Sequence, residues 1–375
     1  MPKKILIVYA TAGIGHKKAA IAVNKALDEK ADKDVEFTII DALDYTNPFF
    51  KWAYLKAYLI IVNKLPLIWG LAYYITDNFY INLIVAPIRR LNNWLNSGKL
   101  ARYLLDTKPD VVISTHFFAS EVISDMKRAS LLKSRLVSVI TDYMLHSWWV
   151  SEFIDTYVVA GQDAGDDLVR YNIPASKIKV IGIPAEPVFS RKLDKKVVRQ
   201  KACLDAERFT VLVIGGGFGV GPIEDIIKTA GQVPGAQIIA ICGHNEDLLR
   251  KLELLGPSLK ASLKPLGFVD NVYEYMDAAD ILISKSGGIT VTEALAKELP
   301  MIVVSPIIGQ ETRNCDYVTR HGAAIRLNRV SDIKGALEDM IAHPDKIERM
   351  RQAIRKIRKP TACYDIARMA VEYGD

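Results

Sequence analysis

The chain has 375 residues, half of them apolar and a quarter charged, with a formal net charge of +6. This composition is ordinary for a folded protein and argues against intrinsic disorder, and the length exceeds what one hydrophobic core usually covers, so we expect two domains. The four cysteines are widely separated and form no CxxC pair, which indicates free thiols in a reducing compartment, the cytoplasm.

The first part of the chain alternates short apolar runs with amphipathic segments. The run that follows Met1-Pro-Lys-Lys has too few apolar residues for a secretion signal, so we interpret it as a first strand. Strands are predicted at residues 5–9, 35–40, 111–114, 136–140, 156–159 and 179–181, and helices at 17–30 and 164–171. This order is typical of a parallel, doubly wound sheet with an α/β fold.

Residues 49–103 interrupt this alternation with an unusual composition. They include seven basic residues, one acid (Asp77) and twelve aromatic residues, and no uninterrupted apolar run reaches the roughly eighteen residues of a membrane span. Aromatic and cationic side chains mixed with aliphatic ones suit a surface that lies in the headgroup layer. We therefore expect residues 49–103 to bind an anionic membrane surface. The alternative is a pair of amphipathic helices that only cover the N-terminal sheet.

A second strand series begins after residues 182–189, where two prolines follow a strand and mark a domain boundary. Strands are predicted at 210–214, 237–241, 261–266, 281–284 and 301–304, and helices at 246–255, 289–297, 345–358 and 362–373. The sequence thus predicts two Rossmann-like domains, residues 1–185 and 186–352, followed by a C-terminal helix within 353–375.

A phosphate site is predicted at residues 284–293, Ser-Lys-Ser-Gly-Gly-Ile-Thr-Val-Thr-Glu. A strand leads through a glycine pair into a helix, so unpaired backbone N–H groups and the positive end of the helix dipole converge at one point. Glu293 lies about one turn inside that helix and can accept hydrogen bonds from two neighbouring hydroxyls, as a ribose presents. Neither the P-loop nor the GxGxxG spacing occurs. The alternative is that the glycines only allow close packing of the helix on the strand.

Together with Pro-Ile-Ile-Gly-Gln-Glu at residues 306–311, this run resembles the donor site of GT-B nucleotide-sugar glycosyltransferases. It is most similar to the family 28-like group of the monogalactosyldiacylglycerol synthases, the bacterial diacylglycerol glucosyltransferases and the lipid II-forming N-acetylglucosaminyltransferase. The resemblance implies two Rossmann-like domains facing across a cleft, with the final helix returning to the first domain. It implies donor contacts from Ser286, Gly287, Gly288, Ile289, Thr290, Glu293, Gln310 and Glu311.

Two further segments are assigned to the donor. The glycine-rich loop at residues 215–221 can approach a diphosphate closely because glycine has no Cβ, and we expect Gly217, Phe218 and Gly219 to border the donor. Phe268 and Val269 resemble the stretch whose backbone pairs with the uracil ring in this family.

The first loop of the chain carries a candidate base. It resembles the Gly-Gly-Gly-His element of the family, although Ala12 and Ile14 stand where glycine is common, and it places Gly15 and His16 at the carboxyl end of the first strand. A histidine has an ordinary pKa near 6.5, which suits a general base. We assign His16 to catalysis and Gly15 to the acceptor site, the alternative being a helix cap or a packed ring.

The run Thr-Asp-Tyr-Met-Leu-His-Ser-Trp-Trp, which ends at Trp149, resembles the T-D-x-x-x-H-x-x-W element of the diacylglycerol glycosyltransferases. Asp142 can deprotonate the acceptor, or it can orient His16 or His146, as carboxylates do for catalytic imidazoles. The sequence leaves this choice open, so Asp142 and His146 are assigned to catalysis together with His16. Trp149 and His116 are assigned to the acceptor site, the alternative being that this aspartate caps a turn and the tryptophans are core.

Together with the family resemblance, these residues predict an inverting glycosyltransferase that moves a hexose from a UDP-sugar to a lipid, above all diacylglycerol, as a peripheral protein at the cytoplasmic face of the membrane. We expect no metal, because the histidines are scattered and the single Asp-x-Asp, Asp32-Lys-Asp34, lies in a lysine-flanked turn. No cofactor and no nucleic-acid partner are expected. The alternatives are a GT-B UDP-N-acetylglucosamine 2-epimerase and a non-catalytic protein that binds lipid surfaces.

Overall fold

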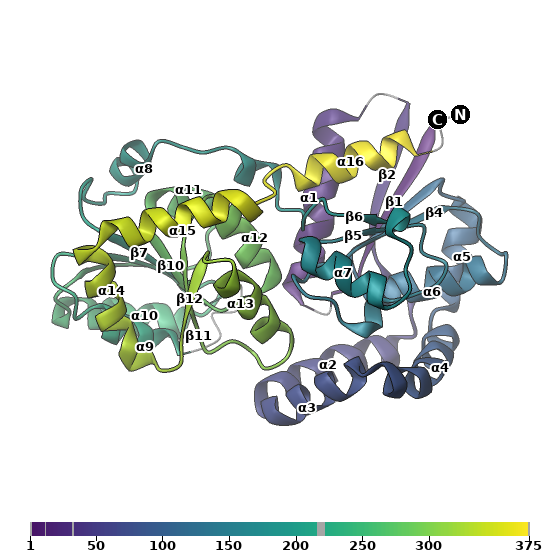
Figure 1. Ribbon diagram of the computed structural model, residues 1–375, viewed down its shortest axis with the longest axis horizontal. Helices are drawn as coiled ribbons and strands as arrows, with labels where there is room; N and C mark the ends of the chain where they lie inside the picture. The colour runs from purple at the N-terminus through teal and green to yellow at the C-terminus, as the bar shows by residue number, and fades with distance from the viewer. Residues whose placement is uncertain (1, 12, 32–33, 216–221, 374–375) are drawn as a thin grey trace. The chain divides into compact units, whose positions relative to one another are not determined.

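The chain divides into two compact units, each built on its own parallel sheet (Figure 1). The computed structural model describes residues 2–11, 13–31, 34–215 and 222–373. Unit 1 consists of Met1–Pro187, Ile307–Arg313 and Thr361–Asp375, and unit 2 of Val188–Pro306 and Asn314–Pro360. The first division lies beside the boundary predicted at residue 185, but two later pieces of the chain belong to unit 1.

Within the described residues, unit 1 contains a six-stranded parallel sheet in the order β2-β1-β3-β4-β5-β6. Its strands are β1 (Lys3–Tyr9), β2 (Val35–Asp41), β3 (Val111–Ser114), β4 (Arg135–Val139), β5 (Thr156–Val158) and β6 (Ile178–Lys179). The central strands are nearly continuous runs of Val, Ile and Leu, as expected for strands covered on both faces. The strand order reverses between β1 and β3, and ligands bind at such switch points beyond the carboxyl ends of the strands.

Helices cover both faces of this sheet. The helices of unit 1 are α1 (Ile14–Lys30), α2 (Pro48–Lys64), α3 (Pro66–Asp77), α4 (Phe79–Asn96), α5 (Gly98–Thr107), α6 (Phe117–Arg128), α7 (Gln162–Arg170) and α16 (Ala362–Glu372). Alternate β1 residues face opposite sides, so Ile5 and Ile7 pack in the core with α1 and α16, whereas Leu6 and Val8 pack in the core with α5 and α6. The chain's last helix thus completes the core of unit 1, beside α1 (Figure 1).

Residues 49–103 form parts of four helices, α2 to α5, rather than one amphipathic pair. Asn47 and Asn78 cap α2 and α4 with their side chains, and Pro48 and Pro66 occupy first helical positions. No single helix among the described residues is long and apolar enough to span a membrane. Pro48–Val62 and Pro66–Asp77 satisfy the length and composition criteria only as a pair bent by 111°.

Among its described residues, unit 2 has a six-stranded parallel sheet in the order β12-β11-β10-β7-β8-β9, the dinucleotide-fold order, with its switch point between β7 and β10. Its strands are β7 (Thr210–Ile214), β8 (Gln237–Ile241), β9 (Ser262–Leu266), β10 (Ile281–Ser284), β11 (Met301–Val304) and β12 (Ala324–Leu327). The strand β12 was not predicted from the sequence, because this edge strand is short and carries an exposed arginine, Arg326.

The remaining helical elements complete unit 2. They are α8 (Lys195–Lys201), α9 (Ile223–Ala230), α10 (Glu246–Leu255), α11 (Val272–Ala278), α12 (Gly288–Ala296), α14 (Ile333–Ala342), α15 (Pro344–Ile357) and the part of α13 (Gln310–Arg320) that follows Arg313. The 3₁₀ turns of the chain are η1 (Ala42–Tyr45), η2 (Ser147–Trp149), η3 (Ala175–Lys177), η4 (Pro187–Ser190), η5 (Gly256–Ser258) and η6 (Val330–Asp332). Unit 2 continues past the end predicted at residue 352, because Ile354 is buried and Arg355 and Arg358 pair with Glu298.

Candidate active site

Two loops meet at the switch point of unit 1. His16 lies in the first turn of α1, after β1, and Thr115 follows the neighbouring strand β3. The Nδ1 atom of His16 is 2.7 Å from the backbone oxygen of Thr115 and 2.9 Å from the hydroxyl oxygen of Thr141. In return, the hydroxyl of Thr115 donates to the backbone oxygen of His16 at 2.9 Å. The imidazole is therefore fixed from two strands.

These contacts determine the tautomer of His16. A carbonyl oxygen only accepts hydrogen bonds, so Nδ1 carries the proton and Nε2 is the nitrogen that can take one. Burial lowers the pKa of His16, and the charge of Asp142 and the hydrogen bond to Thr115 oppose this effect only in part. The ring is neutral near pH 7, as a general base must be.

Asp142 follows β4 and is buried with its carboxylate held by an amide. Nε2 of Gln310 donates to both carboxylate oxygens, at 2.7 and 2.8 Å. Gln310 lies in the 307–313 segment, which belongs to unit 1. Its neighbour Glu311 accepts a hydrogen bond from the backbone N–H of Ile307 at 2.7 Å and so closes its own loop. Gln310 and Glu311, which the resemblance assigns to the donor site, therefore belong to the same unit as the candidate catalytic residues.

The structure does not support the catalytic role predicted for His146. Its Nδ1 accepts a hydrogen bond from the backbone N–H of Trp148 at 3.2 Å, and its Nε2 lies 3.0 Å from the backbone oxygen of Tyr73. Both ring nitrogens are therefore occupied by the backbone. Burial lowers the pKa of His146 to about 4, so the ring stays neutral. His146 caps η2 and fixes the 141–149 loop to α3.

His116 has one occupied ring nitrogen and faces His16. Its Nδ1 accepts a hydrogen bond from the backbone N–H of Phe118 at 3.0 Å, so the hydrogen of the neutral ring resides on Nε2. The ring centroids of His116 and His16 are 4.4 Å apart, with an interplanar angle of 69° in an edge-on arrangement. Burial, and then the neighbouring His16, lower the pKa of His116 well below its ordinary value. His116 can thus donate a hydrogen bond but is a poor proton acceptor.

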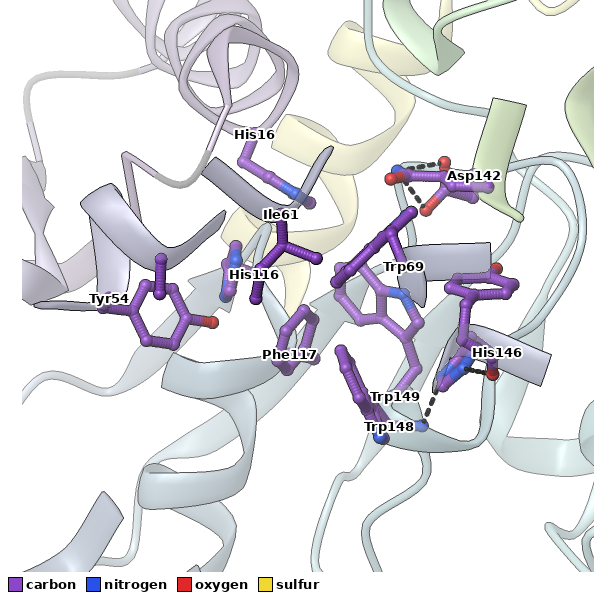
Figure 2. Close-up of a pocket in the computed structure, with 13 residues that line it drawn as sticks. His16, Tyr54, Ile61, Trp69, His116, Phe117, Asp142, His146, Trp148 and Trp149 are labelled. Carbon is purple, nitrogen blue, oxygen red and sulfur yellow. Dashed lines mark hydrogen bonds between the residues drawn. The ribbon is translucent and has the colours of Figure 1, made fainter. Parts of the chain in front are cut away.

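A cavity of about 250 Å³ in unit 1 is bordered by His16, His116, Asp142 and Gln310. Figure 2 shows the rings of Phe117, Trp148 and Trp149 below the two histidines and the aspartate in this view. Gly15, although predicted to contact the acceptor, is not among the residues that line the cavity. The other apolar side chains of the lining are those of Tyr54, Ala57, Ile61, Trp69 and Tyr73.

The lining of this cavity by α2 and α3 was not predicted from the sequence. Residues 49–103 were assigned to a membrane surface, and within them Tyr54, Ala57 and Ile61 of α2 and Trp69 and Tyr73 of α3 line the cavity. The spacing of the α2 residues puts them on one helical face, and this periodicity was the available signal. The segment thus supplies the apolar wall of the candidate site.

In unit 2, the predicted phosphate site forms the β10–α12 junction at the switch point. Gly287 is the N-cap of α12, and the backbone oxygen of the buried Ser286 accepts a hydrogen bond from the Asn314 side chain at 3.1 Å. Ile289, in the first turn of α12, is buried. Glu293 is buried in the second turn of α12. Gly288 and Thr290 complete the first turn.

An aromatic pair follows the neighbouring strands β8 and β9. The exposed Phe268 ring stacks on His244, with centroids 4.4 Å apart and an interplanar angle of 12°, and Val269 next to it is half-buried. His244 was not singled out from the sequence. Gly217, Phe218 and Gly219, also predicted to border the donor, lie outside the described residues.

No group of three or more His, Cys, Asp or Glu side chains that could hold a metal ion occurs in the part of the chain that the structure describes. Asp32, from the single Asp-x-Asp sequence, lies outside that part.

Comparison with known families matches both halves of the chain. The model described as monogalactosyldiacylglycerol (MGDG) synthase matches residues 16–185, and that of the glycosyltransferase family 28 C-terminal domain matches residues 210–363. A processive diacylglycerol beta-glucosyltransferase of Bacillus cereus is 30% identical over 367 residues, covering 95% of this chain and 90% of that protein. A protein of the same name from Bacillus thuringiensis is 29% identical over 365 residues, with the same coverage.

Solved structures show the same fold. MurG of Acinetobacter baumannii has a TM-score of 0.64 at 16% identity, covering 99% of this chain and 100% of that one. The calicheamicin glycosyltransferase CalG4 has a TM-score of 0.63 at 13% identity, covering 100% of this chain and 99% of that one. The UDP-GlcNAc 2-epimerase of Neisseria meningitidis has a TM-score of 0.59 at 16% identity, covering 98% of this chain and 100% of that one. At these identities the likeness shows the fold alone, which is the GT-B class.

The sequence relatives define the protein more narrowly than the fold does. The chain belongs to the glycosyltransferase family of the monogalactosyldiacylglycerol synthases and diacylglycerol glucosyltransferases. The predictions of the family, of the GT-B fold and of a glycosyltransferase enzyme are confirmed.

Proposed function

We propose that this chain transfers a hexose from a UDP-sugar to the free hydroxyl of diacylglycerol. The diacylglycerol glucosyltransferases among its relatives support this acceptor. One structural observation carries the proposal: a neutral His16 borders a cavity whose other walls are largely aromatic and aliphatic. An acceptor with a reactive hydroxyl beside an apolar body matches such a site, since apolar walls bind the body and a few polar groups orient the reacting atom.

In the proposed reaction, Nε2 of His16 takes the proton of the acceptor hydroxyl as its oxygen bonds to the anomeric carbon. The bond from that carbon to the UDP oxygen breaks, and UDP leaves on the opposite side. One such displacement inverts the configuration, so an α-linked donor gives a β-linked glycolipid. The charge of Asp142 stabilises the imidazolium that forms. Asp142 is the alternative base, but Gln310 occupies both of its oxygens, which leaves His16 as the better proton acceptor.

The donor proposal places the diphosphate at the N-terminal end of α12, beside Lys285, with the ribose hydroxyls at Glu293. Phe268 and Val269 would contact the uracil. Because these groups supply backbone N–H donors and positive charge, we propose that the leaving UDP needs no divalent ion. Activity should therefore persist in EDTA, and restoration by Mg²⁺ or Mn²⁺ of activity lost in EDTA would contradict this part of the proposal.

We further propose that α2, α3 and α4 bind the cytoplasmic leaflet of the membrane. Large apolar side chains are exposed along these helices, and Lys56 lies over the ring of Trp52. An exposed apolar surface mixed with basic residues suits an anionic headgroup layer. The exposed side chains include those of Phe49, Trp52, Leu67, Ile68, Leu71, Leu83, Ile84, Ile88, Leu91, Trp94 and Leu95.

Vesicle flotation tests the membrane proposal. The wild type should float with vesicles that contain phosphatidylglycerol and less with pure phosphatidylcholine, and Leu67→Glu combined with Ile84→Glu should abolish flotation. Leu254→Glu is the matched control, since Leu254 is 83% exposed in unit 2 and lies outside the proposed surface. Equal loss in the control, or none in the double variant, would contradict the proposal.

The function itself is tested with a panel of UDP-glucose, UDP-galactose and UDP-N-acetylglucosamine and with vesicles that contain diacylglycerol. Mass analysis should find a hexosyl-diacylglycerol for at least one donor. Conversion of UDP-N-acetylglucosamine to its 2-epimer without lipid would favour the epimerase alternative. Binding to vesicles with no turnover of any donor would favour a non-catalytic protein.

A further inference from the structure

The segment 307–313 is packed against α3 without space between them. A Cβ at Gly70 of α3 would lie 2.2 Å from Cγ2 of Ile308, and a Cβ at Gly309 would lie 2.8 Å from Cγ of Tyr73. Gly309 also has a φ of +97°, which favours glycine. Two glycines, one on each partner, therefore allow this close contact within unit 1.

An arginine at the end of this segment fixes it to the same helix. Arg313 forms an ion pair with Asp77, the last residue of α3, and its Nη1 donates to the backbone oxygen of Leu145 at 2.8 Å. The guanidinium also lies over the rings of Tyr73 and Tyr74, 5.2 and 5.5 Å from their centroids. Both charged side chains are mostly buried, so water weakens this ion pair less than it weakens a salt bridge on the surface.

Asp77 reaches the candidate active site as well. Its second oxygen accepts a hydrogen bond from the backbone N–H of Ser147 at 2.7 Å, and the backbone oxygen of Thr76 accepts one from the Ser147 hydroxyl at 2.8 Å. The end of α3 therefore holds the loop that contains Asp142 and the segment that contains Gln310. Arg313 lies three residues after Gln310, so the two side chains emerge from the same side of α13.

We propose that Asp77 and Arg313 are positioning residues that place Gln310 against Asp142 and thereby set how the hexose of the donor is held. This inference rests on the proposed function. An amide offers a carbonyl acceptor besides its NH₂ group, so Gln310 can donate to Asp142 and accept from a sugar hydroxyl at the same time. Without the Asp77–Arg313 pair, Gln310 loses its fixed position, while the groups of unit 2 that would hold UDP are unchanged.

The test separates binding of the hexose from binding of the nucleotide. Asp77→Asn keeps an oxygen for the N–H of Ser147 but removes the charge, Arg313→Gln removes the other charge, and Arg313→Lys restores it. Arg320→Gln, an exposed arginine on the same helix, is the matched control. For each protein, kcat and KM are measured with the UDP-hexose that the wild type transfers to diacylglycerol vesicles. UDP affinity is measured by calorimetry, and folding by thermal unfolding.

Asp77→Asn and Arg313→Gln should each raise the KM for the UDP-hexose about tenfold, which is a central estimate for one lost charge-assisted interaction. UDP affinity should stay within about twofold, Arg313→Lys should recover part of the loss, and the double variant should be no worse than either single one, because both remove the same interaction. An unchanged KM, or losses of UDP affinity and thermal stability that parallel the loss of activity, would overturn the inference. A wild type that transfers no hexose would instead overturn the proposed function.

Discussion

The Nδ1 atom of His16 lies 2.7 Å from the backbone oxygen of Thr115, which is 99 positions later in the chain. Because that oxygen belongs to the backbone, substitution of the Thr115 side chain would leave the contact in place. The interaction fixes the proton on Nδ1 and leaves Nε2 to accept another. The base is thus defined by the meeting of β1 and β3 rather than by a neighbouring carboxylate.

His16→Ala should lower kcat about 10²- to 10⁴-fold, the usual contribution of a general base. UDP affinity should be unchanged, since His16 belongs to unit 1 and the proposed UDP contacts to unit 2. Steady-state kinetics with diacylglycerol vesicles and calorimetry with UDP measure the two quantities. His343→Ala, which removes an exposed histidine in unit 2, is the control. Full activity of His16→Ala would end the assignment of the base.

The pKa of His16 provides a second prediction. Burial lowers this pKa and the charge of Asp142 raises it, so Asp142→Asn should lower it further. In an NMR titration the wild-type ring should titrate below the ordinary value of about 6.5, and the variant ring at a lower pH still. The base is active when unprotonated, so activity should be lost as the pH falls through this pKa, at a lower pH in the variant. An upward shift in Asp142→Asn would contradict the geometry.

Stability should also depend on pH because three buried histidines share the site. His16, His116 and His146 all have lowered pKa values in the folded chain, that of His146 at about 4. Below pH 6.5 the unfolded chain binds protons that the folded chain does not. As the pH decreases below 6.5, the free energy of unfolding should therefore fall by up to about 1.4 kcal/mol per pH unit for each histidine. Urea unfolding between pH 7 and 5 measures this slope, which should be smaller in His146→Gln.

Glu293→Ala should weaken UDP binding without affecting acceptor chemistry. Two hydrogen bonds from ribose hydroxyls to a carboxylate are worth about 1.5–3 kcal/mol each, so a loss of at least about tenfold in affinity is expected. Calorimetry with UDP measures it, and Glu338→Ala, an exposed glutamate of α14, is the control. Because Glu293 is buried, thermal unfolding must show that the variant folds. A folded Glu293→Ala that binds UDP normally would remove this residue from the donor site.

The sequence predicted β7, β8, β10 and β11 at their observed bounds, because each consists largely of apolar residues. It also pointed to His16 and Asp142, which follow β1 and β4 and border one cavity. The remaining features depend on distant contacts. The carbonyl of Thr115 carries no sequence signal, since every residue has one, and the packing of Gly70 on Ile308 joins residues that no local pattern relates.

Glu121 is predicted to support the cavity wall through a buried ion pair. Its carboxylate is 1% exposed and accepts hydrogen bonds from Arg89 at 2.8–3.2 Å and from Asn93 at 2.6 Å, and Arg89 lies over the ring of Trp148, 5.9 Å from its centroid. Glu121→Ala leaves a largely buried guanidinium uncompensated and should lower the free energy of unfolding by about 3–5 kcal/mol, as measured in urea. Glu121→Leu combined with Arg89→Met should restore most of it, because both charges of this pair are removed, and Arg90, 3.7 Å from Glu121, keeps Asp125 at 3.8 Å. Glu338→Ala, which removes the partner of the surface residue Lys334, should lower the free energy of unfolding by less than about 1 kcal/mol. An equal decrease in Glu121→Ala and Glu338→Ala would refute the role of burial.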